Sequence, residues 1–199
     1  MAEEWRINMQ SLIDELKDEY GYSSYDIAMV KYVLTSIFYE FSKLIIFGIF
    51  GFLGYFKSFL VSLILLLFLR INIGGIHCKH YITCFLLTFV VLFSSIILLP
   101  KLLFVAPILI ISICTICMII NYKIGPIASP FRPSPDSILI KKCQNTGFVI
   151  IFIFIIFVSF FHEFSLFATY FQVGFWTIVL HTAQLFIAKI SKKEECVNA

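Results

Sequence analysis

Long apolar blocks separated by short polar interruptions run along most of the chain. Blocks without amphipathic periodicity predict helices that are apolar on all sides, surrounded by lipid or by one another. Six membrane-spanning helices are predicted, at 41–56, 58–69, 82–99, 102–121, 147–162 and 164–190. The first two are short against the ~20 residues that cross a bilayer. An alternative is therefore that 41–69 forms a tilted or partly re-entrant hairpin that turns near Gly54 and Lys57.

The segments that flank these blocks are polar. In the first twenty residues, apolar side chains recur at three- and four-residue steps with charged residues between them. This pattern is typical of an amphipathic helix on the membrane surface, although a cytosolic cap on the bundle would show it too, and it lacks the apolar core of a secretory signal. One integral-membrane domain is predicted for 1–199, with amphipathic or interfacial helices in 1–40, a transmembrane bundle in 41–190 and a cytoplasmic tail in 191–199. The polar segment 121–145 contains four prolines, which predicts an ordered loop or lid.

Composition supports an all-α, polytopic membrane bundle. Hydrophobic residues make up 60% of the chain and charged residues only 14%, against about 25% charged in soluble domains. The net charge of +3 is too small and too dispersed to suggest nucleic acid.

Basic residues predict the orientation of the bundle. With six crossings and a cytoplasmic N-terminus, only Lys57 and Lys101 fall outside the cell. All other lysines and arginines, apart from the boundary residue Lys43, fall on the cytoplasmic side: Arg6, Lys17, Lys31, Arg70, Lys79, Lys123, Arg132, Lys141, Lys142, Lys189, Lys192 and Lys193. This is the positive-inside distribution of membrane proteins.

The segment 70-RINIGGIHCKHYITC-84 concentrates the candidate chemistry at that cytoplasmic face. A histidine can take the proton of a cysteine thiol, and the thiolate then attacks a carbonyl. His80 and Cys84 are four residues apart and would share one face of a helix. His77 and Cys84 would lie about 10 Å apart along a straight helix, so this pairing requires a bend, which Gly74 and Gly75 permit.

Other interpretations of the polar residues stay open. His77, Cys78, His80 and Cys84 could bind a metal, but their spacing matches no standard zinc pattern. Cys114 and Cys117 form a CxxC that could be a redox pair, or two small apolar side chains in a span. Glu163 is expected at an outer turn, and His181 is expected either to mark an intramembrane site or to form an interhelical hydrogen bond.

The motif GGIHCKHYITC resembles the AgrB family, the accessory gene regulator B peptidases of Gram-positive quorum sensing. The resemblance extends over most of the chain: the amphipathic start, the motif at the cytoplasmic end of a span, the proline-bearing basic loop and the charged tail. It differs in the loop, where SPFRPSP with Arg132 replaces the family's lysine run before its proline. By position, the resemblance makes His77 the general base and Cys84 the nucleophile.

The resemblance implies a cysteine endopeptidase with a Cys–His dyad. It would cut the acidic C-terminal tail from an AgrD-like propeptide, form an acyl-thioester on Cys84, and promote closure of a thiolactone or lactone ring. The expected partners are this propeptide, the lipid bilayer of a Gram-positive cell membrane and a possible homodimer, with no nucleic acid, metal or cofactor. Basic residues on the same face are expected to hold the acidic tail: Arg70, Lys79, Arg132, Lys141 and Lys142.

Two questions about this site follow from the sequence. No Asp or Glu occurs between Glu40 and Asp136. A third, orienting residue would therefore come from one of these acids or from an amide: Asn72, Asn121 or Gln144. The competing functions are a membrane thiol oxidoreductase that uses Cys114 and Cys117, and a non-enzymatic membrane scaffold.

Overall fold

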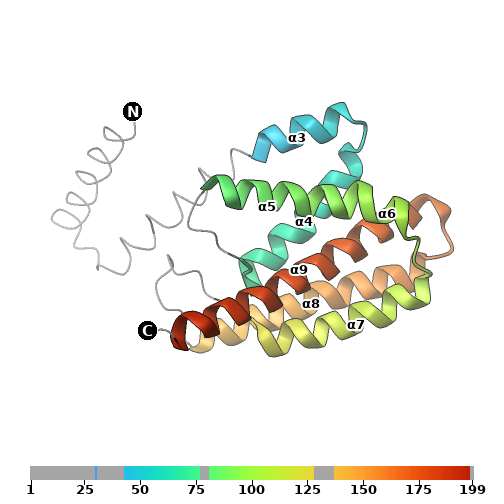
Figure 1. Cartoon of the computed structure of the whole chain (residues 1–199). Coiled ribbons are helices and arrows are strands. Elements are labelled where there is room, and N and C mark those ends of the chain that lie inside the picture. The colour runs from blue at the N-terminus through green and yellow to red at the C-terminus, as the bar shows by residue number, and fades with distance from the viewer. Residues whose placement is uncertain (1–29, 31–42, 77–80, 128–136, 198–199) are drawn as a thin grey trace, which may run out of the picture.

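The computed structural model describes residues 30, 43–76, 81–127 and 137–197. These residues form helices and short connections, with no β-strand among them (Figure 1). The elements are α3 (Lys43–Phe52), α4 (Phe56–Ile73), α5 (Tyr81–Phe93), the π-helix η1 (Ser94–Leu98), α6 (Leu99–Leu102), α7 (Pro107–Ile124), α8 (Ser137–Phe161) and α9 (Ser165–Val197).

The predicted all-α membrane bundle is confirmed. Five helical segments in the described part of the chain are long and apolar enough to cross a membrane. They are Phe56–Ile73, Ile82–Leu102, Pro107–Ile124, Ser137–Phe161 and Ser165–Ile190. The second of these runs without a break through α5, η1 and α6. The amphipathic helix predicted in the first twenty residues lies outside the described part.

The first predicted span, 41–56, does not form one long helix. The described part of α3 has ten residues, which at ~1.5 Å per residue gives about 15 Å, half of the bilayer's ~30 Å hydrocarbon core; the residues before Lys43 lie outside the described part. The chain then turns at Gly54, which has φ +78° and takes this backbone conformation because it lacks a Cβ. Within the described residues there are thus five candidate spans instead of six. The alternative of a hairpin that turns near Gly54 fits the structure better.

The predicted loop 121–145 is also shorter than expected. α7 continues to Ile124, and α8 already begins at Ser137. The prolines end at Pro135, and the polar residues after it are compatible with a helix whose first turns lie at the membrane boundary. Lys141 and Lys142 therefore belong to the first turns of α8 and not to a loop.

α4 and α9 occupy the centre of the bundle. One group of buried apolar side chains joins the second half of α4 to α7, α8 and α9, and a second group joins the first half of α4 to α3, α5 and η1. Half of the most apolar stretch of α9 is buried, against 17% of that of α8. Helices approach closely where a side chain is absent: Ile73, the last residue of α4, packs against the backbone of Gly147 in α8.

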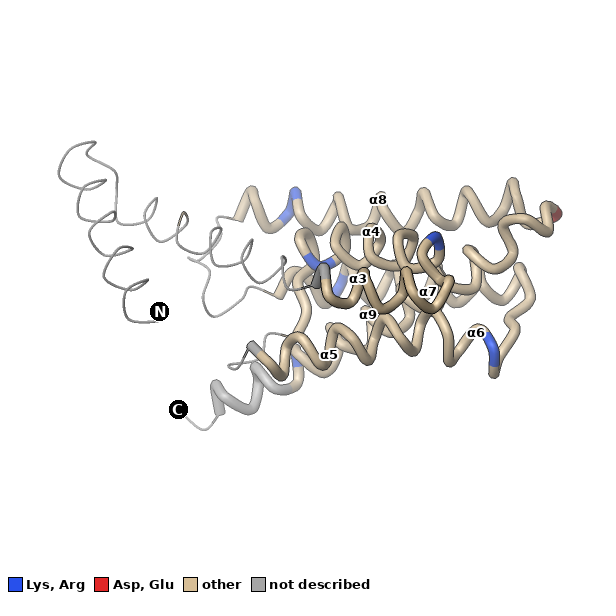
Figure 2. Tube along the Cα trace, turned by 90° about the horizontal axis from the view of Figure 1, so that it is seen from above, with Lys and Arg blue, Asp and Glu red and all other residues tan. Residues whose placement is uncertain are grey.

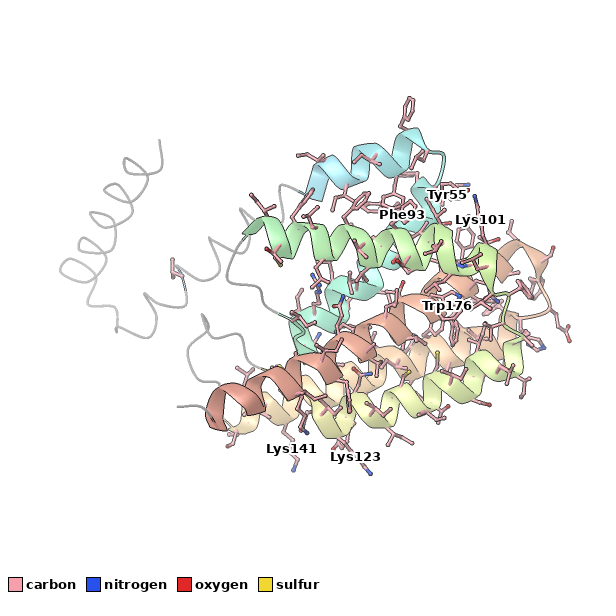
Figure 3. The ribbon with its side chains drawn as sticks, in the orientation of Figure 1. Tyr55, Phe93, Lys101, Lys123, Lys141 and Trp176 are labelled. Carbon is pink, nitrogen blue, oxygen red and sulfur yellow. The ribbon has the colours of Figure 1, made fainter. Side chains whose placement is uncertain are left out.

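The long helices alternate in direction, which separates charged residues between the two ends of the bundle. Figure 2 shows basic residues of α8 toward the end where that helix begins and the acidic residue of the α8–α9 turn at the other end, and Figure 3 shows Lys101 of α6 toward that second end. Glu163 lies in that turn, between Phe161 and Ser165, as predicted. We refer to the end that contains Gly74, Cys84 and Lys141 as the basic end.

Candidate functional site

Cys84 lies in the first turn of α5, at the basic end, and is half-buried with a free thiol. One turn later, the Oγ1 of the fully buried Thr88 donates a hydrogen bond to the carbonyl of Cys84 at 2.9 Å. The candidate nucleophile therefore lies on regular helix, at the start of a candidate membrane span that follows a polar stretch of the sequence.

α4 ends at Ile73 and is followed by Gly74, one of the two glycines predicted to allow a bend before Cys84. Gly74 has φ +85°, and a Cβ at this position would collide with the backbone carbonyl of Ile127. Two hydrogen bonds from distant parts of the chain stabilise the end of α4: Ile127 N–H donates to the carbonyl of Ile73 at 3.0 Å, and His181 Nε2 to that of Gly74 at 3.0 Å. The chain thus leaves α4 in a conformation that glycine adopts readily, held by α9 and by the segment after α7.

Arg70, in the last turn of α4, reaches two other helices. Its Nη1 donates to Thr88 Oγ1 in α5 at 3.0 Å, and its Nη2 donates to Gln184 Oε1 in α9 at 3.3 Å. The side chain is half-buried. Because Thr88 in turn binds the carbonyl of Cys84, a continuous chain of hydrogen bonds joins α9, through Arg70, to the helix that carries the cysteine.

His181 and Gln184 lie one turn apart on α9, and both are buried. The predicted interhelical hydrogen bond of His181 is confirmed in its contact with Gly74, whose carbonyl can only accept, so Nε2 carries the proton. Within the described part of the chain, His181 Nδ1 and Gln184 Nε2 find no hydrogen-bond partner. The basic end therefore contains a cluster of polar side chains, His181, Gln184 and Arg70, inside helices that are otherwise apolar.

The residues predicted to bind substrate are distributed unevenly in the structure. Lys141 and Lys142 are exposed on the first turns of α8, and Figure 3 shows Lys141 and the nearby Lys123 pointing away from the bundle. Arg70 instead points into the bundle, toward α5 and α9. Lys79 and Arg132 lie outside the described residues. So do His77 and His80, and the choice between these two histidines as the base stays a prediction.

The side-chain nitrogens of the amides proposed as orienting residues already have partners. Asn121 Nδ2 donates to the carbonyl of Cys117 and to the hydroxyl of Thr182, both at 2.7 Å, while its buried Oδ1 has no hydrogen-bond partner among the described residues. Gln144 Nε2 donates to the carbonyl of Gly125 at 2.7 Å, and Asn72 Nδ2 to that of Phe68 at 2.8 Å. Each amide thus stabilises local or interhelical structure, and Glu40 and Asp136 lie outside the described residues.

Cys114 and Cys117 are free thiols buried in α7. Both belong to the group of apolar side chains that joins α7 to α4, α8 and α9. Buried cysteines commonly pack as small apolar side chains, and Cys114 and Cys117 do so here.

Metal ligation can be assessed only for part of the predicted set. Of His77, Cys78, His80 and Cys84, only Cys84 is described. Within the described ranges, no group of three or more His, Cys, Asp or Glu side chains is placed to hold a metal ion.

The sequence analysis missed the roles of Thr88 and Gln184. Both stand inside long apolar blocks, and hydropathy averages over such isolated polar residues. A signal existed: Gln184 follows His181 by three residues, so the two share one face of a helix that is otherwise apolar.

Comparison with known proteins identifies the family. Residues 9–186 match the model of the AgrB family, described as Accessory gene regulator B. The chain is 27% identical over 180 residues to AgrB-like protein 1 of Clostridium perfringens, which covers 89% of this chain and 94% of that protein. It is 38% identical over 84 residues to an AgrB-like protein of Clostridium beijerinckii, which covers 40% of this chain and 42% of that protein. No solved structure matches the chain. Together with the multi-pass helical bundle, the match over most of its length shows that this chain belongs to the AgrB family.

Proposed function

We propose that this protein is a membrane-embedded cysteine endopeptidase that removes the C-terminal tail of an AgrD-like propeptide and promotes closure of a thiolactone or lactone ring. Membership of the AgrB family implies a role in agr quorum-sensing peptide processing, with an AgrD-like substrate. The observation that carries the finer proposal is the position of Cys84. It is a half-buried, free thiol at the start of a span, at the end of the bundle that also presents Lys141 and Lys142.

The proposed reaction uses Cys84 as nucleophile and His77 as base. The imidazole takes the thiol proton, and the thiolate attacks the carbonyl at the junction between the propeptide core and its tail. The C–N bond breaks, the imidazolium returns its proton to the departing amine, and an acyl-thioester remains on Cys84. An internal cysteine or serine of the substrate then attacks the thioester, closes the ring and releases Cys84 as the thiol.

Water must be kept from the acyl-thioester until the ring closes, because hydrolysis would give a linear product. A cysteine at the boundary of the hydrocarbon region is suited to this: lipid and apolar side chains surround the span on one side, and a membrane-bound peptide reaches it from the other. The proposal places the basic end in the cytoplasm of a Gram-positive cell, where the propeptide is made. The exposed lysines Lys141 and Lys142 are proposed to attract the acidic tail of the substrate.

Coexpression with the propeptide tests the dyad. We expect Cys84→Ala and His77→Ala each to abolish tail release, because the nucleophile or its base is lost, and His80→Ala to retain it. Mass spectrometry of the propeptide and of the enzyme measures tail release and the thioester. Cys84→Ser should accumulate no acyl-enzyme, since an unactivated hydroxyl is a poor nucleophile near neutral pH.

Each result separates the proposal from its alternatives. Cleavage by His77→Ala but not by His80→Ala would move the base to His80. Undiminished function in Cys84→Ala would favour a non-enzymatic scaffold. The double variant Cys114→Ala, Cys117→Ala should still cleave, whereas a membrane thiol oxidoreductase would lose its function.

A further inference from the structure

On one side, the first turns of α5, which carry Cys84, have few apolar contacts with the rest of the described chain. Ile82, Leu86 and Val90 are all exposed, at 69%, 53% and 56%. In a bilayer these side chains contact lipid, which packs against a helix but does not fix its rotation or its height. The placement of Cys84 must therefore depend on the face of α5 that points into the bundle.

On that inner face, Arg70 makes a polar contact with α5. The planar guanidinium offers N–H groups in a rigid fork, and here one arm binds Thr88 Oγ1 at 3.0 Å while the other binds Gln184 Oε1 at 3.3 Å. Thr88 lies one turn after Cys84 on the same helix, and its Oγ1 donates to the carbonyl of Cys84 at 2.9 Å, so a contact that fixes Thr88 also places Cys84. Thr88 and Gln184 are 0% and 5% exposed, so water does not compete freely for these bonds.

α9 also binds the chain directly after α4, where it leaves that helix toward α5. His181, one turn before Gln184, donates to the carbonyl of Gly74. Two buried polar side chains of α9 thus have separate contacts. His181 binds Gly74 at the end of α4, and Gln184 is linked through Arg70 to α5, the helix that carries Cys84. α9 is the most deeply buried of the candidate spans, which makes it a rigid reference for both.

We infer that Arg70 and Gln184 are positioning residues for the reaction at Cys84: together they fix the rotation and height of α5 against α9. This inference rests on the proposed function. It assigns Arg70 a geometric role, different from the expected capture of the substrate's acidic tail. The two roles predict opposite effects on the Michaelis constant and on the turnover number.

Arg70→Lys is the discriminating variant. It keeps the positive charge, but an ammonium group is a single point donor and does not reproduce the fork between Thr88 and Gln184. We expect kcat for tail release to fall on the order of 100-fold while KM changes by less than about threefold, because misplacement of a reacting group costs turnover and not binding. The full chain in lipid vesicles is assayed with a synthetic AgrD-like propeptide that has an amphipathic leader, a cysteine-containing core and an acidic tail. A variant in which KM rises and kcat is kept would overturn the inference and favour charge capture.

Two variants of α9 provide the matched comparison. Gln184→Glu should retain kcat to within about threefold, because a carboxylate accepts the same hydrogen bond from Arg70 more strongly; Gln184→Leu should lose turnover as Arg70→Lys does. Gln172→Leu is the control: Gln172 binds both backbone groups of Val105 at the opposite end of α9, at 3.2 and 2.7 Å. Removing it should leave the kinetics of tail release unchanged. Equal losses in Gln172→Leu and Gln184→Leu would mean that general stability, and not positioning, is affected.

Hydrogen–deuterium exchange in the absence of substrate separates this inference from the proposed function. Backbone amides of residues 84–90 should exchange on the order of tenfold faster in Arg70→Lys and in Gln184→Leu, but not in Gln172→Leu. If the wild-type protein releases no tail, the proposed function fails and the catalytic role of the two residues fails with it, whatever the exchange shows. If the wild type is active and exchange in α5 does not change, only the positioning role is overturned.

Discussion

At the scale of the residue, the end of α4 shows how a glycine in a polar motif serves the fold. The carbonyls of Ile73 and Gly74 would be left unpaired by the end of the helix. They are bound instead by Ile127 N–H and by the imidazole of His181. The backbone of Ile127 can approach Gly74 this closely because Gly74 has φ +85° and carries no side chain that would collide with it. The fold therefore requires the glycine at position 74 of this motif, independently of any role in catalysis.

Gly74→Ala should accordingly destabilise the folded protein by about 1–3 kcal/mol, the cost of placing a side chain on a residue with this positive φ, with more from the collision with Ile127. Thermal unfolding in detergent, followed by circular dichroism, measures the loss. Gly75→Ala is the control, because Gly75 lacks a positive φ and its Cβ would lie 4.0 Å from the nearest atoms of Arg70. Equal thermal stability of the Gly74→Ala and Gly75→Ala variants would show that the tight contact with Ile127 does not hold.

At the scale of the element, the early start of α8 changes the expected role of two lysines. On a flexible loop, Lys141 and Lys142 could move with a bound substrate. On α8 they are adjacent residues whose side chains point in directions about 100° apart. Both are exposed, so they can meet an acidic peptide without disturbing the bundle. Their charges act over roughly one Debye length, about 8 Å at physiological salt.

Lys141→Ala and Lys142→Ala should each raise KM for tail release about two- to fivefold without lowering kcat, as expected for exposed ion pairs. The effect should shrink as salt is raised, because screening weakens the attraction in the wild type too. Lys101→Ala is the matched control: Lys101 is exposed at the opposite end, with its ammonium group 5.5 Å from the centre of the Tyr55 ring. Salt-independent effects, or an equal effect of Lys101→Ala, would remove the two lysines from the substrate site.

At the scale of the whole molecule, alternation of the five candidate spans places Cys84, Lys141 and the start of α8 at one end and Glu163 at the other. A cytosolic substrate requires the first of these ends to face the cytoplasm. The excess of lysine and arginine there supports that orientation.

Cysteine labelling on intact cells tests the orientation. In a variant that retains only Cys143, in the first turns of α8, an impermeant maleimide should label the protein only after the membrane is permeabilised. Glu163→Cys in the same background should be labelled from outside, because Glu163 is exposed in the turn between α8 and α9. Labelling of Cys143 on intact cells would reverse the topology and remove the route of a cytosolic propeptide to Cys84.

Part of the fold follows from local properties of the sequence. Blocks of apolar residues long enough to cross the bilayer predict spans, because lipid leaves backbone groups to pair only within a helix. The prediction that Glu163 lies in a turn is confirmed, because a charged residue between two apolar blocks is most stable outside the hydrocarbon region, where the chain turns from one span to the next. The ends of the elements were less predictable: the first block is interrupted at Gly54, where the backbone turns, and α8 begins ten residues before its apolar block because polar residues continue a helix outside the hydrocarbon region.

The sequence by itself determined the family, the membrane bundle and the position of Cys84 at the start of a span, because each rests on local composition or on a short motif. Only the tertiary structure decided what surrounds that cysteine. Arg70 is 14 residues before Cys84 in the chain, whereas Gln184 is 100 residues after it, and they meet because α4, α5 and α9 pack together. Hydrogen bonds between buried side chains depend on the angle and height at which helices cross. Hydropathy carries no information about either, so the assignment of Arg70 to the inside of the bundle required the packed helices.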